Sequence, residues 1–359
     1  MDSQYLRRTY VDDLGGVRLH ARDKEREARP MHDLTATTQE RDGPFFSDVV
    51  GGLSRVQKTL PCRWLYDERG SDLFEAITRL PEYYPTRAET EILADRASEI
   101  AEFAGEDAVV VEYGAGAGVK TELVLDSLCA PQGYVPIDIA EEYLLQTAER
   151  MASRFPGLWV RPVACDFVQA FDMPPGIPPG RRIGFFPGST IGNLDRADAE
   201  TFLRQMWRHV ESGGGAIVGV DLLKDVDVLL RAYDDHEGVT AAFNLNILSR
   251  INRELGADFR PERFRHEARW NEADKAVEMH LVSLAEQSVA IGERAFHFRH
   301  GETIHTESSR KYDRTGFASV AAVAGWDLAH VWDDSEGRFC VFALVASDDA
   351  SIHGFPAAA

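Results

Sequence analysis

Between residues 106 and 223 the sequence alternates between short apolar runs and helical patterns, and this alternation limits the possible folds more than any other feature. Five runs have the character of buried strands: residues 107–114, 133–140, 158–165, 183–190 and 213–223. Three stretches between them carry apolar residues at helical spacing: residues 120–128, 141–155 and 195–210. Strands that alternate with helices at this interval form a parallel sheet with helices on both faces. We therefore expect an α/β fold.

A different pattern begins after residue 223. A helical stretch covers residues 240–255, and a strand-like run covers residues 276–284. Residues 326–346 are typical of two strands joined by a turn at residues 334–337, an antiparallel hairpin that can close the sheet. The intervening residues and the segment before the sheet could form a second lobe over the carboxyl ends of the strands, where open α/β sheets bind ligands.

These patterns divide the chain into three parts. Residues 1–34 are expected to be a disordered tail, because they are polar and lack an apolar pattern. We assign residues 35–87 and 224–313 to the second lobe, and residues 88–223 and 314–348 to the sheet domain.

The charge balance excludes several classes of partner. The chain of 359 residues carries 59 Asp and Glu against 39 Lys and Arg, a formal net charge of −20. A surface this acidic repels phosphate backbones and anionic lipids, so we expect neither nucleic acid nor a membrane as a partner. No apolar run approaches the length of a transmembrane helix, and the first residues lack the apolar stretch of a signal peptide.

The cysteines and histidines form no familiar metal motif. The cysteines are far apart and make no C-x-x-C pair, which favours reduced thiols in the cytoplasm: Cys62, Cys129, Cys165 and Cys340. The nearest approach to a histidine cluster is His297, His300 and His305. In a strand, the spacing of His297 and His300 puts them on opposite faces, so we expect surface histidines and no metal.

A glycine-rich turn follows the first expected strand, with the sequence Glu112-Tyr113-Gly114-Ala115-Gly116-Ala117-Gly118. Glycines permit a tight turn there and let a ligand approach the backbone. The dinucleotide fingerprint G-x-G-x-x-G/A fails, because its third position counted from Gly114 falls on Val119. An acid two residues before the first glycine, here Glu112, suits the S-adenosylmethionine pattern instead.

Carboxylates end the next two expected strands. Asp138 is placed to accept hydrogen bonds from both ribose hydroxyls, and Asp166 with Phe167 is placed to receive and cover an adenine. Either aspartate alone could be a helix N-cap. Together with the glycine turn they favour a nucleoside site, and a methyltransferase over a dehydrogenase.

Four longer segments are more distinctive: residues 65–93 (LYDERGSDLFEAITRLPEYYPTRAETEIL), 185–194 (FFPGSTIGNL), 240–259 (TAAFNLNILSRINRELGADF) and 305–312 (HTESSRKY). Together they resemble the L-histidine Nα-methyltransferases of ergothioneine biosynthesis, over nearly the whole chain from about residue 33 to residue 346. The resemblance implies a Rossmann-like class I methyltransferase fold with a closing hairpin, plus a second α+β substrate-binding lobe. It also implies Nα-trimethylation of L-histidine to hercynine, with S-adenosylmethionine as co-substrate and no metal.

The resemblance assigns individual residues. Those expected beside S-adenosylmethionine are Tyr66, Gly114, Gly116, Lys120, Asp138, Asp166 and Phe167. Those expected to bind L-histidine and its mono- and dimethyl forms are Tyr83, Asn193, Tyr233, Met279, Glu307 and Ser309. Tyr66 and Asn193 are the catalytic candidates. The turn departs slightly from the family, because it reads GAGAG where many relatives have a serine or threonine.

The chemistry of the substrate residues suits an amino acid. Asn193 and Tyr233 would supply neutral donors to the substrate carboxylate, without a cation that repels the sulfonium. Glu307 and Ser309 match the polar atoms of an imidazole. Each residue also has an ordinary structural explanation: a surface acid for Glu307, core packing for Met279 and Tyr83, or a helix cap for Asn193.

The expected mechanism is in-line displacement of the sulfonium methyl by the neutral α-amine. An α-amino group is largely protonated at neutral pH, so its proton must be lost first. None of the assigned residues is a histidine or lysine placed as a base, so the proton is expected to leave to water or to a water bound to a tyrosine. Alignment would supply most of the acceleration.

Three other functions stay open. A relative could methylate another aromatic amino acid, such as tryptophan, although an indole has little use for both Glu307 and Ser309. A nicotinamide-linked oxidoreductase is disfavoured by Val119 and by the closing hairpin. A binding module could keep the cofactor pocket without turnover. We expect a monomer that acts on small molecules.

Overall fold

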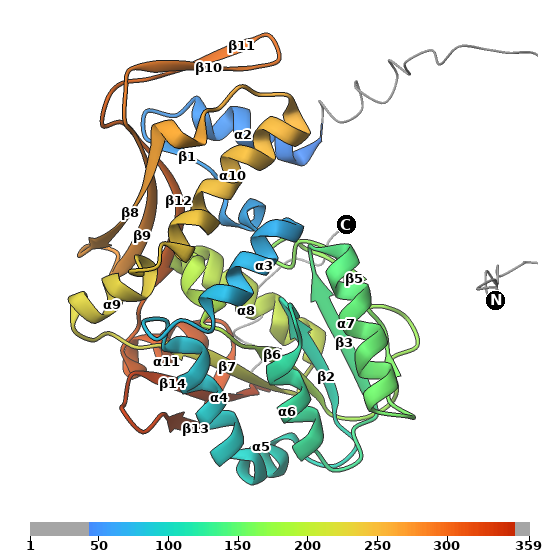
Figure 1. Ribbon diagram of the computed structural model, residues 1–359. Helices are drawn as coiled ribbons and strands as arrows, with labels where there is room; N and C mark the ends of the chain where they lie inside the picture. The colour runs from blue at the N-terminus through green and yellow to red at the C-terminus, as the bar shows by residue number, and fades with distance from the viewer. Residues whose placement is uncertain (1–42, 349–359) are drawn as a thin grey trace, which may run out of the picture.

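The computed structural model describes residues 43–348, so the tail expected at residues 1–34 lies outside the described residues. Figure 1 shows two lobes, a sheet domain in the lower part of the view and a second lobe at the upper left. Within the described chain, no helix combines the length and the apolar character needed to cross a bilayer.

The sheet domain is built on eight strands in the order β13-β14-β7-β6-β2-β3-β4, with β5 also paired to β3. Their bounds are β2 Val109–Tyr113, β3 Gly133–Asp138, β4 Trp159–Val160, β5 Val163–Ala164, β6 Arg182–Phe186, β7 Gly215–Asp221, β13 Trp326–Asp333 and β14 Phe339–Ala346. Strands β2 to β7 run parallel, whereas β14 is antiparallel to both β7 and β13. A parallel sheet closed by this hairpin confirms the expected class I methyltransferase fold.

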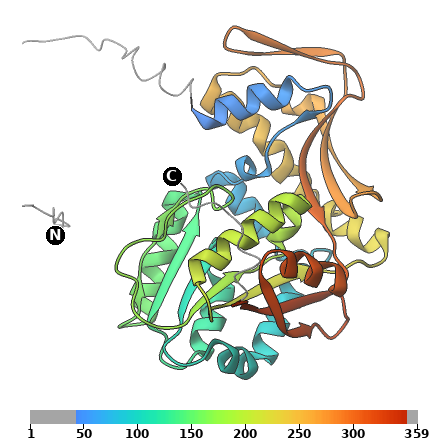
Figure 2. The same cartoon turned by 180° about the vertical axis from the view of Figure 1, so that it is seen from behind.

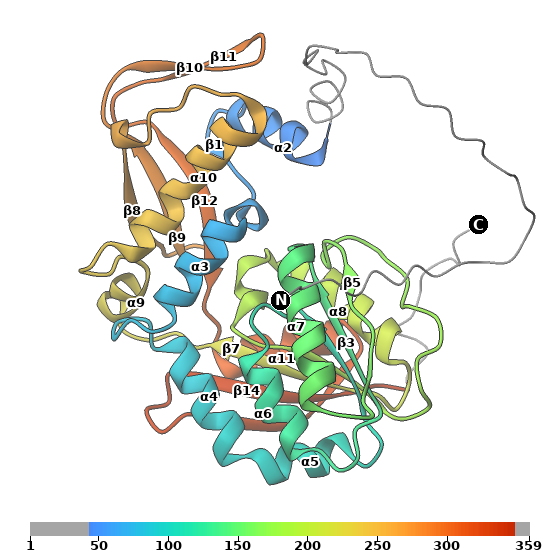
Figure 3. The ribbon, with the colours of Figure 1, turned by 45° about the vertical axis from the view of Figure 1, so that its right-hand side comes forward.

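Helices cover both faces of this sheet. Figure 3 shows one face, covered by α4 (Pro85–Asp95), α5 (Ala97–Ala104), α6 (Val119–Ser127) and α7 (Glu141–Arg154). Figure 2 shows the other face, covered by α8 (Arg196–Val210) and α11 (Arg314–Val323). Side chains alternate between the faces, so Val110 packs with the first set of helices and Val111 with the second. Because both faces are buried, the strands are continuous apolar runs.

All five expected strands are shorter in the structure, and two of them differ most from the expected runs. The run 158–165 is split into β4 and β5, because Pro162 lies between them and has no N–H for the ladder. The run 183–190 ends at Phe186, because Gly188 and Ser189 turn the backbone with φ of +80° and +57°. The 3₁₀ helix η3 (Thr190–Asn193) then follows.

The second lobe is a four-stranded sheet with helices packed on one face. The strand order is β1-β12-β9-β8, with bounds β1 Lys58–Thr59, β8 Phe264–Asn271, β9 Ala276–Ser283 and β12 Thr303–Arg310. The helical elements are α2 Pro44–Leu53, η2 Cys62–Leu65, α3 Glu68–Ile77, α9 Val226–Tyr233, α10 Val239–Leu255 and η4 Pro261–Arg263. A hairpin of β10 (Gln287–Ile291) and β11 (Arg294–Phe298) projects at the top of Figure 1.

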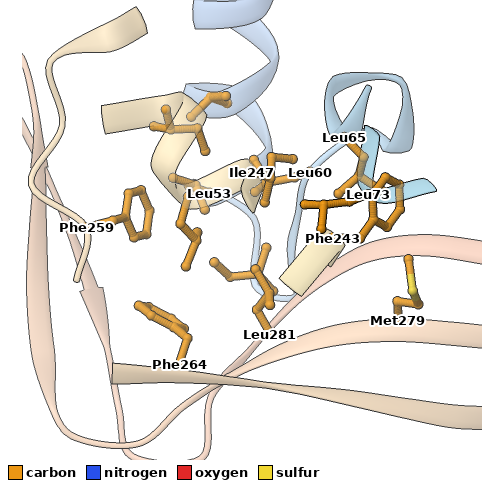
Figure 4. Close-up of a cluster of buried hydrophobic side chains, with 14 of the residues drawn as sticks. Leu53, Leu60, Leu65, Leu73, Phe243, Ile247, Phe259, Phe264, Met279 and Leu281 are labelled. Carbon is orange, nitrogen blue, oxygen red and sulfur yellow. The ribbon is translucent and has the colours of Figure 1, made fainter. Parts of the chain in front are cut away.

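The core of this lobe lies between α10 and its sheet. The helix buries Phe243 and Ile247, among others, at the three- and four-residue spacing of an amphipathic helix. Figure 4 shows these side chains with Leu281 and, toward the end of the cluster, Met279.

The chain crosses between the two lobes between α3 and α4, after β7 and after β12, and the last two crossings lie side by side. The chain leaves the sheet after β7 and returns at the end of β12, where Leu222 and Tyr312 form a parallel bridge. Nearby, η3 packs against β12 so closely that a Cβ added to Gly192 would lie 2.6 Å from the Arg310 carbonyl oxygen. We call the Asp221–Leu222 and Lys311–Tyr312 pairs the neck of the second lobe. The neck lies at the carboxyl end of the parallel strand β7.

Candidate functional site

The glycine turn leaves its backbone open to a ligand. Gly114 and Gly116 have φ of +74° and +45°, a left-handed conformation that glycine adopts without strain. A Cβ added to Gly116 would meet nothing within 4 Å. The Gly116 N–H donates to Asp138 Oδ2 at 3.1 Å, so the carboxylate at the end of β3 lies directly beside the turn. The turn and Asp138 therefore form one edge of a polar cradle.

Glu112 stabilises this turn from behind and is not open to a ligand. It is fully buried, and its carboxylate accepts hydrogen bonds from the Thr121 hydroxyl at 2.6 Å and from the Tyr134 hydroxyl. Burial raises the pKa of Glu112 to about 8. Thr121 lies on α6, which follows the turn, and Tyr134 lies on the neighbouring strand β3. Glu112 therefore ties both elements to its own strand, β2.

Lys120 extends from the start of α6 to a buried acid. Its Nζ lies 2.5 Å from Glu89 Oε2, and the same oxygen accepts the Gly188 N–H at 2.7 Å. The other oxygen, Glu89 Oε1, is buried and has no hydrogen-bond partner in the described chain. Lys120 is thus held over the loop that follows β6.

The expected adenine residues lie on the opposite side of the turn. Asp166 caps its own loop by accepting the Val168 N–H at 3.1 Å, and Arg63 Nη1 lies 3.6 Å from its other oxygen. The Phe167 ring lies against the turn, because a Cβ added to Gly114 would meet it at 3.5 Å. Phe167 also packs on the aromatic core, so part of its surface is already covered.

A cleft of about 280 Å³ separates the second lobe from the β3–α7 turn. Tyr66 lines it, opposite Ile139 and Ala140, which follow Asp138 directly. The Tyr66 ring contacts Phe74 and Phe243 edge-on, so it belongs to the second lobe while facing the sheet domain. Burial, and then the nearby Glu307 carboxylate, raises the pKa of Tyr66, so it is a neutral phenol.

Tyr233 and Ser309 meet at a buried ammonium group. The Tyr233 hydroxyl donates to Ser309 Oγ at 2.7 Å. Lys311 Nζ donates to the Tyr233 hydroxyl at 2.8 Å and to Ser309 Oγ at 2.9 Å, and it lies 2.8 Å from Asp221 Oδ2. The sequence alone predicts neither Lys311 nor Asp221 as a site residue, although Lys311 stands two residues after Ser309 in the segment HTESSRKY.

Glu307 presents an unsatisfied acceptor beside this group. Its Oε2 is buried and has no hydrogen-bond partner within residues 43–348. Burial raises the pKa of Glu307 to about 7, and Lys311 opposes that rise. A buried carboxylate oxygen without a donor is costly, which points to a donor supplied by a ligand.

Met279 and Tyr83 surround the same place. Met279 pairs directly with Glu307 across the β9–β12 ladder, so both side chains point to the helix-covered face. The Tyr83 ring contacts Tyr233 edge-on at 6.2 Å, and it contacts Phe74 in the same way. Met279 and Tyr83 are also members of the core, so packing alone could account for them.

Asn193 ends η3 on the sheet-domain side. It does not cap α8, because that cap is Asp195, whose side chain accepts the Asp198 N–H. The Asn193 side chain makes no hydrogen bond to another residue between positions 43 and 348. The tight contact of Gly192 with Arg310 brings the element that carries Asn193 against β12, one residue beyond Ser309. An amide with free donors near Ser309 can bind an anion.

The three histidines that lie closest together in the sequence, His297, His300 and His305, do not form a cluster in the structure. His297 is exposed on β11 and faces Glu286, His300 follows in a turn, and His305 lies on β12. His305 instead stacks on His280 at 5.0 Å. In the part of the chain that the structure describes, these two histidines and Glu278 form a group of potential metal ligands whose donor atoms lie within 4.8 Å of one another.

This histidine group could hold a metal ion, and hydrogen bonds account for part of it, although His280 Nδ1 is buried without a partner among the described residues. His280 Nε2 lies 2.9 Å from Glu278 Oε2, and His305 Nε2 lies 2.9 Å from the Glu307 carbonyl oxygen. Its side chains come from the face of the sheet opposite Met279. The group is therefore separate from the site described above.

Comparison with known proteins gives a consistent result. The family described as "Histidine-specific methyltransferase, SAM-dependent" matches residues 45–346. The chain is 40% identical to the histidine N-alpha-methyltransferase of Mycolicibacterium smegmatis and 41% identical to that of Mycobacterium tuberculosis, covering 81% of this chain and 92% of each relative. It is 32% identical to ergothioneine biosynthesis protein 1 of Neurospora crassa, over 62% of this chain and 24% of that protein.

Proposed function

The chain belongs to the family of histidine-specific, S-adenosylmethionine-dependent methyltransferases, and from that premise we propose how its site works. The protein methylates the α-amino nitrogen of L-histidine with S-adenosylmethionine, a reaction of ergothioneine biosynthesis. The observation that carries the assignment of the site is the unpartnered Oε2 of Glu307, a buried acceptor that an imidazole N–H would satisfy.

The residues present fit S-adenosylmethionine. The open cradle at Gly116 leaves room for a ligand where a Cβ would otherwise stand, and Asp138 offers a carboxylate beside it. Gly114, Asp166 and Phe167 flank the other side of the turn. Lys120 and Tyr66 complete the proposed set. Bound there, S-adenosylmethionine supplies an electrophilic methyl group.

Histidine would lie across the second lobe with its two polar ends held separately. Asn193 and Tyr233 would donate to the carboxylate. Glu307 would accept the imidazole N–H, and Ser309 would face the other ring nitrogen. Met279 and Tyr83 would cover the faces of the ring. These residues come from both lobes, which supports a site that forms between a cofactor side and a substrate side.

Alignment is the main contribution of these side chains to the reaction. The α-ammonium must lose a proton before its nitrogen can attack, and the described site residues include no free histidine that could take it. Water is the proposed acceptor. The neutral Tyr66 phenol can accept a hydrogen bond from the amino group and so turn the nitrogen lone pair toward the methyl group. Fixing two reactants in line can supply about 7–11 kcal/mol.

The finer details belong to the same proposal. Three successive transfers would give hercynine, with the mono- and dimethyl forms as intermediates. The grouping of side chains within residues 43–348 supports a division into residues 35–87 and 224–313 for substrate and residues 88–223 and 314–348 for cofactor, of which residues 35–42 lie outside the described chain. The four cysteines are free thiols, which supports the reducing cytoplasm as the location, and a monomer is proposed.

The decisive experiment offers all twenty amino acids at once. The purified protein is incubated with S-adenosylmethionine and the mixture, and each mass is followed by chromatography and mass spectrometry. We expect histidine alone to gain one, two and then three methyl groups. Methylation of tryptophan or another amino acid would overturn the roles given to Glu307 and Ser309.

A further inference from the structure

We propose that Lys311 is a positioning residue that makes the Tyr233 and Ser309 hydroxyls donate toward the histidine substrate. This inference rests on the proposed function, because it explains how two of its binding residues acquire the right polarity. Neither the family resemblance nor the relatives' names give Lys311 a role. The inference stands on the contacts of four residues, Lys311, Asp221, Tyr233 and Ser309, which we call the Lys311 cluster.

The ammonium group of Lys311 has no freedom to turn. Both Lys311 and Asp221 side chains are 0% exposed. The three N–H groups of an ammonium are matched by three acceptors, Asp221 Oδ2 at 2.8 Å, Tyr233 Oη at 2.8 Å and Ser309 Oγ at 2.9 Å. The ammonium therefore uses all three of its hydrogens within this cluster.

This arrangement decides where the hydroxyl hydrogens point. An ammonium only donates, so Tyr233 and Ser309 must both accept from Lys311. Each hydroxyl has a single hydrogen, which must then point away from Lys311. In this structure the Tyr233 hydrogen goes to Ser309. When histidine binds, this hydrogen would turn to the substrate carboxylate, while Lys311 still donates to both hydroxyls. The Ser309 hydroxyl donates to no residue in the described part of the chain, so its hydrogen is free for a ligand acceptor.

The resulting polarity matches a neutral imidazole. Such a ring has one N–H donor and one bare nitrogen. Glu307 Oε2 offers a free acceptor, and Ser309 offers a free donor, from the same strand β12. An indole has the donor but no bare nitrogen, so it would leave Ser309 unmatched. Lys311 thus contributes to the selection of a histidine substrate over tryptophan without contacting the substrate side chain.

Asp221 keeps the buried ammonium in place and connects it to the rest of the site. Its carboxylate also accepts from the Tyr84 hydroxyl at 2.8 Å and from Lys224 at 2.5 Å. Its backbone N–H donates to Ser189 Oγ at 2.9 Å, directly before η3. Burial opposes its ionisation, but Lys311 and Lys224 hold the pKa of Asp221 below its usual value. A buried ion pair of this kind adds little net stability, so we infer a role in specificity.

Lys311 also acts on Glu307 through its charge. The titratable groups that face Glu307 are Cys62, Tyr66, Tyr83, Tyr233 and Lys311. Among these, Lys311 is the one cation. Without it, the Glu307 carboxyl would hold its proton to a higher pH, and a protonated carboxyl is a poorer acceptor for an imidazole N–H.

The test compares Lys311→Met with Lys224→Met. Both remove a buried ammonium that pairs with Asp221, but Lys224 makes no hydrogen bond to Tyr233 or Ser309 in the described chain. We expect Lys311→Met to raise the KM for histidine about 10- to 100-fold, the range for losing hydrogen bonds to a charged group. Its affinity for S-adenosylhomocysteine, measured by calorimetry, should stay within about twofold, and Lys224→Met should change neither quantity by more than about threefold.

The pH profile supplies a readout that loss of structure would not move. The acid limb of kcat/KM for histidine should shift to higher pH in Lys311→Met and stay in place in Lys224→Met. An unchanged KM and an unchanged limb in a folded Lys311→Met would overturn the proposal. An equal loss in both variants would also overturn it, since that result would show a general need for charge balance at Asp221.

A measurement on the unaltered protein covers the case in which Lys311→Met does not fold. A crystal structure with histidine and S-adenosylhomocysteine should keep Lys311 Nζ on both hydroxyls, with Ser309 facing a ring nitrogen. Direct contact of Lys311 with the substrate, or release of either hydroxyl, would overturn the inference. Failure of the wild type to methylate histidine would instead reject the proposed function, and it is measured first.

Discussion

Replacing Glu307 with glutamine should stabilise the protein at high pH and lower its affinity for histidine. Burial raises the pKa of Glu307 from 4.5 to about 7. Between these values the folded protein keeps a proton that the unfolded chain has lost. The stability from this group is therefore complete below pH 4.5 and is lost as the pH rises toward 7. Above pH 7 the folded protein carries a buried carboxylate that lacks a donor at Oε2.

The size of the effect follows from the difference in pKa. One pKa unit corresponds to about 1.36 kcal/mol, so a difference of about 2.5 units costs roughly 3 kcal/mol at pH 8 and under about 1 kcal/mol at pH 5. Glutamine has no such dependence, and any effect of its amide on packing is the same at both pH values. The advantage of Glu307→Gln in melting temperature should therefore grow by about 5 °C between pH 5 and pH 8.

Scanning fluorimetry at both pH values measures this growth, with Glu293→Gln as the control because Glu293 is exposed. In the same variant, calorimetry with S-adenosylhomocysteine present should show about tenfold weaker histidine binding, the loss of one charge-assisted hydrogen bond. A melting advantage that is equal at pH 5 and pH 8 would refute the reasoning, because it would mean that Glu307 is not an ionisable group kept from water. Retained histidine affinity would refute its role as the imidazole acceptor.

Three further changes separate the two sides of the site. Gly192→Ala puts a methyl group about 2.6 Å from the Arg310 carbonyl oxygen, so η3 must move away from β12; we expect a loss of about 1–3 kcal/mol in unfolding experiments and a higher KM for histidine. Asp138→Ala removes the carboxylate beside the glycine turn and should weaken S-adenosylhomocysteine binding at least about tenfold by calorimetry, while the fold is kept in circular dichroism. Asn193→Ala should do the reverse, raising the KM for histidine about tenfold with unchanged S-adenosylhomocysteine affinity; equal losses on both sides would contradict the separation.

The sheet domain was predictable because its pattern is local. Each buried strand is a continuous apolar run, and the hairpin at residues 326–346 was expected where β13 and β14 lie. The errors have local causes as well. Pro162 interrupts the third run, and the turn at Gly188 ends the fourth, and neither residue changes the apolar composition that marked the strand.

The site was less predictable, because it depends on which buried polar atoms have hydrogen-bond partners, and the sequence does not show this. The sequence shows that Glu307 is an acid in a polar segment, which is equally typical of a solvated strand. Only the fold shows that its Oε2 is buried and unpartnered. Lys311 lies in the distinctive segment 305–312, but the sequence does not show its partner, because Asp221 is 90 residues away and lies in none of the distinctive segments. Their pairing is set by the neck, where the backbone N–H of Tyr312 donates to the Asp221 carbonyl oxygen.

The position of the neck explains why a charged pair is buried there at all. The later part of the second lobe is inserted directly after Asp221 and ends directly before Lys311–Tyr312, so the ion pair joins the point where the chain leaves the sheet to the point where it returns. An apolar pair could hold the same two segments together at lower cost in desolvation. It could not, however, orient the hydroxyls of Tyr233 and Ser309. Because the ammonium is fixed to the sheet domain through Asp221 while its other two donors hold residues of the second lobe, a displacement of either lobe would disturb the histidine site at once.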